Sequence, residues 1–123
     1  MPLRMKLTAV TLDCADPAAL AAFYRFATGL DPVPESNPEF AGIRFEDGLF
    51  LGFQRVEGYR PPQWPGQAVP QQIHLDFAVA DLDEAESALL AAGAVRPDHQ
   101  PDTRWRVLLD PAGHPFCLTR QRS

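Results

Sequence analysis

The hydrophobic and polar positions of this chain follow one pattern twice. In residues 7–16, apolar and polar side chains alternate as in a strand with one buried face, and the run ends in Ala-Asp before an Ala-rich stretch. Residues 72–81 repeat this order 65 positions later, since 72 − 7 = 65. The segments 47–53 and 112–118 resemble each other at the same offset. The repeat therefore covers a whole module, and we expect two similar halves.

Each half contains one predicted helix. An Asp-Pro pair at 16–17 combines an N-cap with a proline at the first helical position, which predicts a helix over residues 17–28 before a glycine. In the second half, Asp81 and Glu84 have the spacing of a capping box. They predict a helix over residues 82–92, again followed by a glycine.

Two hairpins complete the halves. Residues 40–45 and 49–56 form short apolar runs around Glu-Asp-Gly, and residues 105–109 and 116–119 do so around Asp-Pro-Ala-Gly. With a weaker strand after each helix, both halves are predicted to be β-α-β-β-β. The prolines in those weaker segments suit only an edge or irregular strand.

The segment between the halves has its own composition. Residues 57–71 contain four prolines around Trp64, which favours a stiff, extended connector. We therefore expect one domain made of module one at about 7–56, this connector, and module two at about 72–120. A chain of 123 residues with 46% apolar side chains can bury one core of that kind.

Charge and cysteine content narrow the classes of partner. A formal net charge of −5 with 11 scattered Lys and Arg argues against nucleic acid or an anionic membrane, which both require a basic face. No apolar run approaches the ~20 residues of a membrane span, and no signal peptide is visible, so we expect a cytoplasmic protein. Cys14 and Cys117 fit a reducing compartment, and we expect no disulfide between them.

Several motifs resemble one known superfamily. They are Leu-Asp-Cys-Ala-Asp-Pro at 12–17, Pro-Gln-Trp-Pro at 62–65, Pro-Gln-Gln-Ile-His-Leu-Asp at 70–76, and Asp-Pro-Ala-Gly-His-Pro-Phe-Cys-Leu at 110–118. With the paired modules, they resemble the vicinal oxygen chelate superfamily, which includes glyoxalase I, extradiol dioxygenases and bleomycin-resistance proteins. More narrowly, they resemble the small glyoxalase-like domain proteins common in actinobacteria. The resemblance implies an α+β fold in which two tandem βαβββ modules form a curled mixed sheet with helices on the convex face.

The resemblance also implies four metal-ligand positions, two in each module. In this sequence they hold Ala9, Gly52, His74 and Cys117. Only the last two can bind a metal, whereas a catalytic zinc or iron site needs about three protein ligands and an open position. We expect no bound metal and no other cofactor, with a divalent metal as the disfavoured alternative.

A ligand site is predicted on the inner face of the second module. Alternation puts His74 and Asp76 on the cavity side of their strand. Such a pair can act as general acid and base, contact a ligand, or form a structural hydrogen bond. Cys117 can be a nucleophile or a small buried filler. Gln54 is expected in the same cavity, with Trp64 as a wall.

Four arginines also lie on strands expected to line or rim the cavity: Arg44, Arg55, Arg104 and Arg106. If two of them point inward, they would select a carboxylate or phosphate ligand. If they point outward, they are only solvent-exposed side chains at the edge of the sheet. The sequence leaves this open.

The function that follows is a small-molecule binding protein of the glyoxalase or bleomycin-resistance type, with its ligand between the modules and without a complete metal site. The alternative is a lyase, isomerase or dioxygenase of the superfamily that uses His74, with Asp76 beside it. The resemblance also implies a homodimer, and two-fold dimers are the commonest oligomers.

Overall fold

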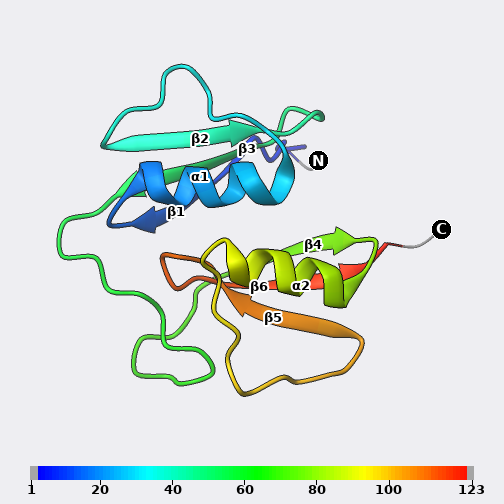
Figure 1. Cartoon of the computed structure of the whole chain (residues 1–123). Helices are drawn as coiled ribbons and strands as arrows, with labels where there is room; N and C mark the ends of the chain where they lie inside the picture. The colour runs from blue at the N-terminus through cyan, green and yellow to red at the C-terminus, as the bar shows by residue number, and fades with distance from the viewer. Residues whose placement is uncertain (1–2, 122–123) are drawn as a thin grey trace. The chain divides into compact units, whose positions relative to one another are not determined.

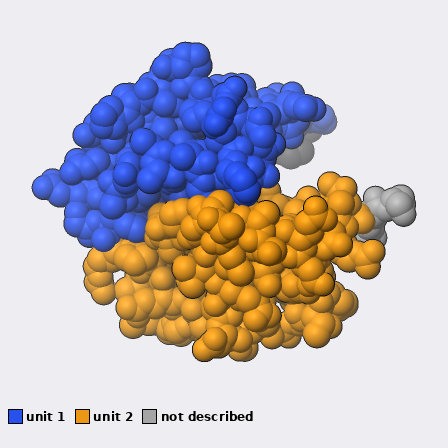
Figure 2. Space-filling model, viewed as in Figure 1, with its two compact units in different colours: residues 1–59 blue, residues 60–123 orange. Residues whose placement is uncertain are grey.

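The computed structural model describes residues 3–121, which form two compact units. Of the described residues, 3–59 belong to the first unit and 60–121 to the second, drawn in blue and orange in Figure 2. Each unit has three strands and one helix (Figure 1). The fold is the α+β fold expected from the sequence, with a mixed sheet in each half.

The first unit consists of β1 (Ala9–Cys14), α1 (Pro17–Thr28), β2 (Phe40–Arg44) and β3 (Phe50–Arg55). The strand order is β1-β3-β2, in which β1 runs parallel to β3 and β2 runs antiparallel to it. A parallel neighbour requires a crossover connection, and α1 provides it. The helix covers the predicted residues.

Packing of α1 on one face of this sheet forms the core of the first unit. The Tyr24 ring stacks on Phe53 of β3, with centroids 5.4 Å apart and planes at 9°. Both side chains are almost completely buried, and burying one side chain of this size contributes about 1.5–3 kcal/mol. Asp16 caps the helix by accepting a hydrogen bond from the Ala19 N–H, and Gly29 ends it with a φ of 77°.

The second unit repeats this arrangement with β4 (Leu75–Val79), α2 (Leu82–Ala91), β5 (Trp105–Leu109) and β6 (Pro115–Arg120). Its strand order is β4-β6-β5, with β4 parallel and β5 antiparallel to β6. Asp81 caps α2 through the Glu84 N–H, as the capping box predicted. The helix ends one residue before the predicted end.

The strand registers confirm the repeat residue by residue. Thr11 pairs with Gly52 in the first unit, and Asp76 pairs with Cys117 in the second. Each residue of the second pair therefore lies 65 positions after its counterpart in the first pair. The antiparallel pair of Phe40 with Gln54 likewise corresponds to that of Trp105 with Thr119. Any residue of one sheet therefore has a definite counterpart in the other.

The strands expected directly after each helix are reduced to single bridges. Pro32 bridges to Ile43, and Val95 bridges to Leu109. Proline has no N–H to donate to a ladder, so these segments stop after one contact. Within the described residues, the modules are therefore β-α-β-β with one additional bridge each.

The prediction of an extended connector was wrong. The Gln63 N–H donates to the Val69 carbonyl at 2.7 Å, which closes residues 63–69 into a loop. Prolines fix φ at a value that suits turns as well as extended chain, and Pro65-Gly66 lies at the centre of this loop. From Arg60 onward, the former connector belongs to the second unit.

One detail of the second repeat also differs from the expectation. His74 was predicted on a strand, but β4 begins one residue later. Its counterpart Ala9 is paired with Phe50, whereas the residue opposite His74 by the repeat is Pro115. Because proline cannot donate a hydrogen bond, the parallel ladder is one residue shorter here.

Candidate functional site

The face of the second sheet away from α2 carries the predicted site. Asp76 of β4 lies opposite Cys117 of β6, and Cys117 lies opposite Val107 of β5. Residues directly opposite each other in a sheet point to the same side. Leu108 and Phe116 occupy the alternate positions and are fully buried.

A pocket of about 490 Å³ lies on this face, entirely within the second unit. Its volume is within the usual range for a small-molecule site. It is lined by Trp64, Gln71, His74, Asp76, Pro101, Trp105, Val107, Pro115, Cys117 and Thr119. We call it the second-unit pocket.

Three side chains with metal-ligating atoms meet on its floor. The Nε2 of His74 lies 3.4 Å from the Oδ1 of Asp76. One ligand atom from each of these residues and from Cys117 lies within 4.8 Å of the others. The expected neighbours His74, Asp76 and Cys117 are thus brought together.

Burial and the neighbouring carboxylate keep the Cys117 thiol protonated. Its pKa is raised to about 11, first by burial, then by the negative charge of Asp76 and by a hydrogen bond to that carboxylate. A thiol with such a pKa is a weak nucleophile near neutral pH, because the thiolate is the reactive form. This environment favours Cys117 as a neutral pocket residue over an activated nucleophile.

The donor set can be tested against the metal that the superfamily implies. Imidazole, carboxylate and thiolate are all ligands that zinc accepts, and three protein ligands suffice for an open zinc site. His74, Asp76 and Cys117 therefore fit a zinc-like ion in type and number, provided that the ion displaces the Cys117 proton. The sequence analysis counted only His74 and Cys117 as possible metal ligands and did not include Asp76.

Gln71 contributes an unsatisfied acceptor to the pocket. Its Oε1 is buried, and within residues 3–121 it has no hydrogen-bond partner. Leaving such an atom unpaired costs about 1–3 kcal/mol. A rotation of the amide towards a donor in the pocket would recover part of that cost.

In the first unit, side chains fill the space that corresponds to the second-unit pocket. A Cβ on Gly42 would lie 2.2 Å from the Cζ of Phe50, and one on Gly52 would lie 2.7 Å from the Cζ of Phe40. The two phenylalanine rings, 6.0 Å apart and at 13° to each other, therefore occupy the space above both glycines. In the second unit, Val107 and Cys117 replace the glycines and Pro115 replaces Phe50, which leaves a hollow.

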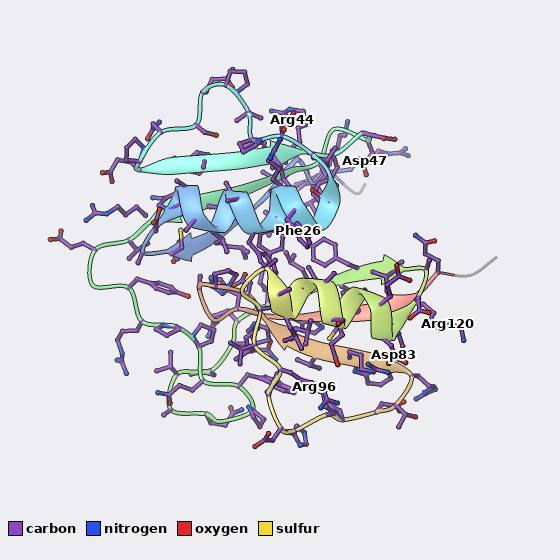
Figure 3. The ribbon with its side chains drawn as sticks, in the orientation of Figure 1. Phe26, Arg44, Asp47, Asp83, Arg96 and Arg120 are labelled. Atoms are coloured by element: carbon purple, nitrogen blue, oxygen red, sulfur yellow. The ribbon has the colours of Figure 1, made fainter. Side chains whose placement is uncertain are left out.

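Each of the four candidate arginines has a partner within its own unit, and none is among the described residues that line the second-unit pocket. Arg44 lies over the Phe50 ring and donates to the Gly48 carbonyl beside the Asp47 turn (Figure 3). The partners of the others are carboxylates: Glu39 for Arg55, Asp102 for Arg104, and Asp83 with Glu86 for Arg106.

The first unit has a hollow of its own, of about 600 Å³, beside the start of α1. Its polar side chains are used by the fold. Asp16 caps α1, the Asn37 Oδ1 accepts hydrogen bonds from the N–H groups of Glu39 and Phe40, and Arg55 pairs with Glu39. These polar side chains of the hollow already have partners in the fold, so we do not assign a ligand to it.

Of the five residues predicted to bind ligand, four line the second-unit pocket, and Gln54 belongs to the first unit. Its part in the site stays a prediction. Six further lining residues lie outside this predicted set: Gln71, Pro101, Trp105, Val107, Pro115 and Thr119. The alternation of side chains along strands could have identified Val107, Pro115 and Thr119, because they lie on the same face as Cys117. Gln71 and Pro101 come from loops, where side chains do not alternate in this way.

A family model for the glyoxalase-like domain matches residues 9–119. The chain belongs to this family. It is thereby a member of the vicinal oxygen chelate superfamily, as the motifs suggested. No curated protein matches this glyoxalase-like chain at a significant level.

Solved structures share the glyoxalase-like fold. A glyoxalase/bleomycin resistance protein/dioxygenase family enzyme from Burkholderia phytofirmans is 24% identical, with a TM-score of 0.72 over 93% of this chain and 97% of its own. A glyoxalase-related enzyme from Fulvimarina pelagi is 25% identical, with a TM-score of 0.67 over 95% and 88%. A bleomycin-binding protein from Streptomyces verticillus, solved with copper(II)-bleomycin, is 21% identical, with a TM-score of 0.59 over 98% and 100%.

Among residues 3–121, no helix is both long enough and apolar enough to cross a membrane. Within residues 3–121, neither Cys14 nor Cys117 forms a disulfide, as predicted.

Proposed function

We propose that this glyoxalase-like protein binds a small organic molecule in the second-unit pocket, and that it does so without a bound metal. The observation that carries the proposal is the asymmetry of the repeat. Phe40 and Phe50 fill one copy of the inner face, whereas the other copy has a hollow of about 490 Å³. A sheet face with only a structural role would favour the filled arrangement, because close packing stabilises the fold.

Polar groups at the floor of the hollow support a binding role. His74 and Asp76 keep 44% and 61% of their side chains exposed, so they contribute little to the core. Apolar walls with a few converging polar groups are typical of small-molecule sites. The bleomycin-binding protein from Streptomyces verticillus, a structural neighbour, also supports small-molecule binding on this fold.

Mass spectrometry of the protein under native conditions tests the proposal. The purified chain should carry co-purifying small molecules, and His74→Ala and Asp76→Ala should reduce their occupancy while the thermal midpoint stays close to that of the wild type. Glu84→Gln, on the exposed side of α2, provides a control that changes charge away from the pocket. If His74→Ala and Asp76→Ala lower the thermal midpoint markedly and leave occupancy unchanged, the two residues form a structural pair and the proposal fails.

The second candidate is a metal-dependent or acid–base enzyme of the superfamily that uses His74. The cluster of His74, Asp76 and Cys117 is the observation that favours it. A metal held there would supply Lewis-acid chemistry, while the imidazole and carboxylate could hold or transfer a proton. Elemental analysis after purification without chelator tests the metal-dependent form of this candidate: no stoichiometric metal is expected, and about one ion per chain that is lost in Cys117→Ser would support that form.

A further inference from the structure

We propose that the second-unit pocket selects flat, apolar molecules that carry a positive charge and hydrogen-bond donors over anions of the same size. This inference rests on the proposed function and adds the chemical class of the ligand. It follows from the walls, the charge and the hydrogen-bonding groups of the pocket.

The walls favour a flat, apolar body. Both tryptophans of the chain, Trp64 and Trp105, line the pocket together with Pro101, Val107 and Pro115. Indole faces attract apolar rings by stacking and attract cations through their negative π-face. An aromatic or otherwise planar ligand therefore gains from both tryptophans.

The charge of the pocket favours a cation. Asp76 is the carboxylate among its lining residues, and of the described residues that line it none is Lys or Arg. An anion would meet Asp76 without a compensating cation.

Two basic side chains lie close to the tryptophans and also affect the charge around the pocket. The Arg104 guanidinium lies 5.3 Å from the centroid of the Trp105 ring, but Asp102 binds it at 2.8 Å and compensates its charge. The His99 ring lies 5.5 Å from that of Trp64 and is exposed. The His74 Nε2 lies 3.4 Å from the Asp76 Oδ1, and with that imidazole neutral the Asp76 charge is the uncompensated charge among the lining residues.

The hydrogen-bonding groups favour a donor on the ligand. The Asp76 carboxylate only accepts hydrogen bonds, and the buried Oε1 of Gln71 lacks a donor among the described residues. The Thr119 hydroxyl can accept as well. An ammonium or amino group satisfies these acceptors, whereas a ligand carboxylate cannot.

Intrinsic fluorescence gives a direct assay, because both tryptophans line the pocket. Three probes of nearly equal size differ in charge: 2-phenylethylamine, 2-phenylethanol and phenylacetate. We expect saturable changes in tryptophan emission, with the amine bound about two- to fivefold more tightly than the alcohol, as for an exposed ion pair. Phenylacetate should bind more weakly than the alcohol.

Two variants assign the preference to the pocket. Asp76→Asn should equalise the affinities for the amine and the alcohol, since the amide keeps the shape of the side chain without its charge. Glu84→Gln makes the same charge change on α2 and should preserve the order of the probes.

The outcomes separate the two proposals. Binding of all three probes with equal affinity, or tighter binding of phenylacetate, refutes the cation preference while small-molecule binding stands. A preference for the amine that survives in Asp76→Asn refutes it too. No saturable response from any probe refutes the proposed ligand class, while the co-purification measurement decides small-molecule binding itself.

Discussion

The raised pKa of Cys117 predicts a slowly reacting thiol. With the pKa at about 11 in place of 9.0, the thiolate fraction at pH 8 is about 0.1% in place of about 10%. Alkylation by iodoacetamide should therefore be roughly 100-fold slower than for an ordinary cysteine. Folding also becomes less favourable as the pH rises from about 9 towards 11, because the folded protein holds this proton more tightly than the unfolded chain.

Asp76→Asn tests the cause of this shift. Burial is the largest contribution and the Asp76 carboxylate comes next, so removing the charge should lower the pKa only part of the way towards 9. Alkylation below pH 9 should then become faster in the variant, while burial of the thiol is unchanged.

Peptide mapping by mass spectrometry after timed alkylation measures the rate at Cys117 separately from that at the buried Cys14. A series of pH values distinguishes the pKa from accessibility, because accessibility alters the rate at every pH by the same factor. Circular dichroism confirms that the protein stays folded across the series. A wild-type midpoint near 9, or no acceleration in Asp76→Asn, would refute the reasoning.

Three further predictions concern the fold and assembly. Gly42→Ala places a Cβ 2.2 Å from the Phe50 Cζ and 2.9 Å from the Leu51 carbonyl oxygen, so urea unfolding should show a loss of about 1–3 kcal/mol, partly recovered when Phe50→Ala is added. A loss in the double variant equal to the sum of the two single losses would argue against this contact. Asp110→Ala removes a buried carboxylate that accepts hydrogen bonds from the N–H groups of Ala112 and His114, and should lower unfolding stability by about 1–3 kcal/mol; an unchanged midpoint would contradict it. We also expect a homodimer, and a sedimentation mass of one 13.6 kDa chain at micromolar protein would exclude it.

Local signals in the sequence determined the elements and their repetition. Asp16 and Asp81 fix the helix starts because a side-chain oxygen reaches backbone N–H groups within one turn, without help from distant residues. The offset of 65 between the halves carried over to the strand registers. Since side chains alternate along a strand, that register also placed Asp76, Cys117 and Val107 on one face.

Only the tertiary structure decided how the two inner faces differ. Whether a face is filled or hollow depends on ring packing above Gly42 and Gly52. Alternation cannot reveal this packing, because a phenylalanine at the start of a strand can turn outward or lie across the sheet. The loop closed between Gln63 and Val69 likewise depends on a hydrogen bond that composition does not specify.

The start of β4 and the partners of the arginines could not be predicted from the sequence, because both depend on residues far apart in the chain. His74 lies outside β4 because Pro115, 41 positions later (115 − 74 = 41), has no N–H to pair with the strand. Two of the four arginines, Arg55 and Arg106, pair with the carboxylates of Glu39 and Asp83, which are their neighbours only in the folded unit. Sequence patterns specify which face a residue occupies, while partners far apart in the chain determine what that face can bind.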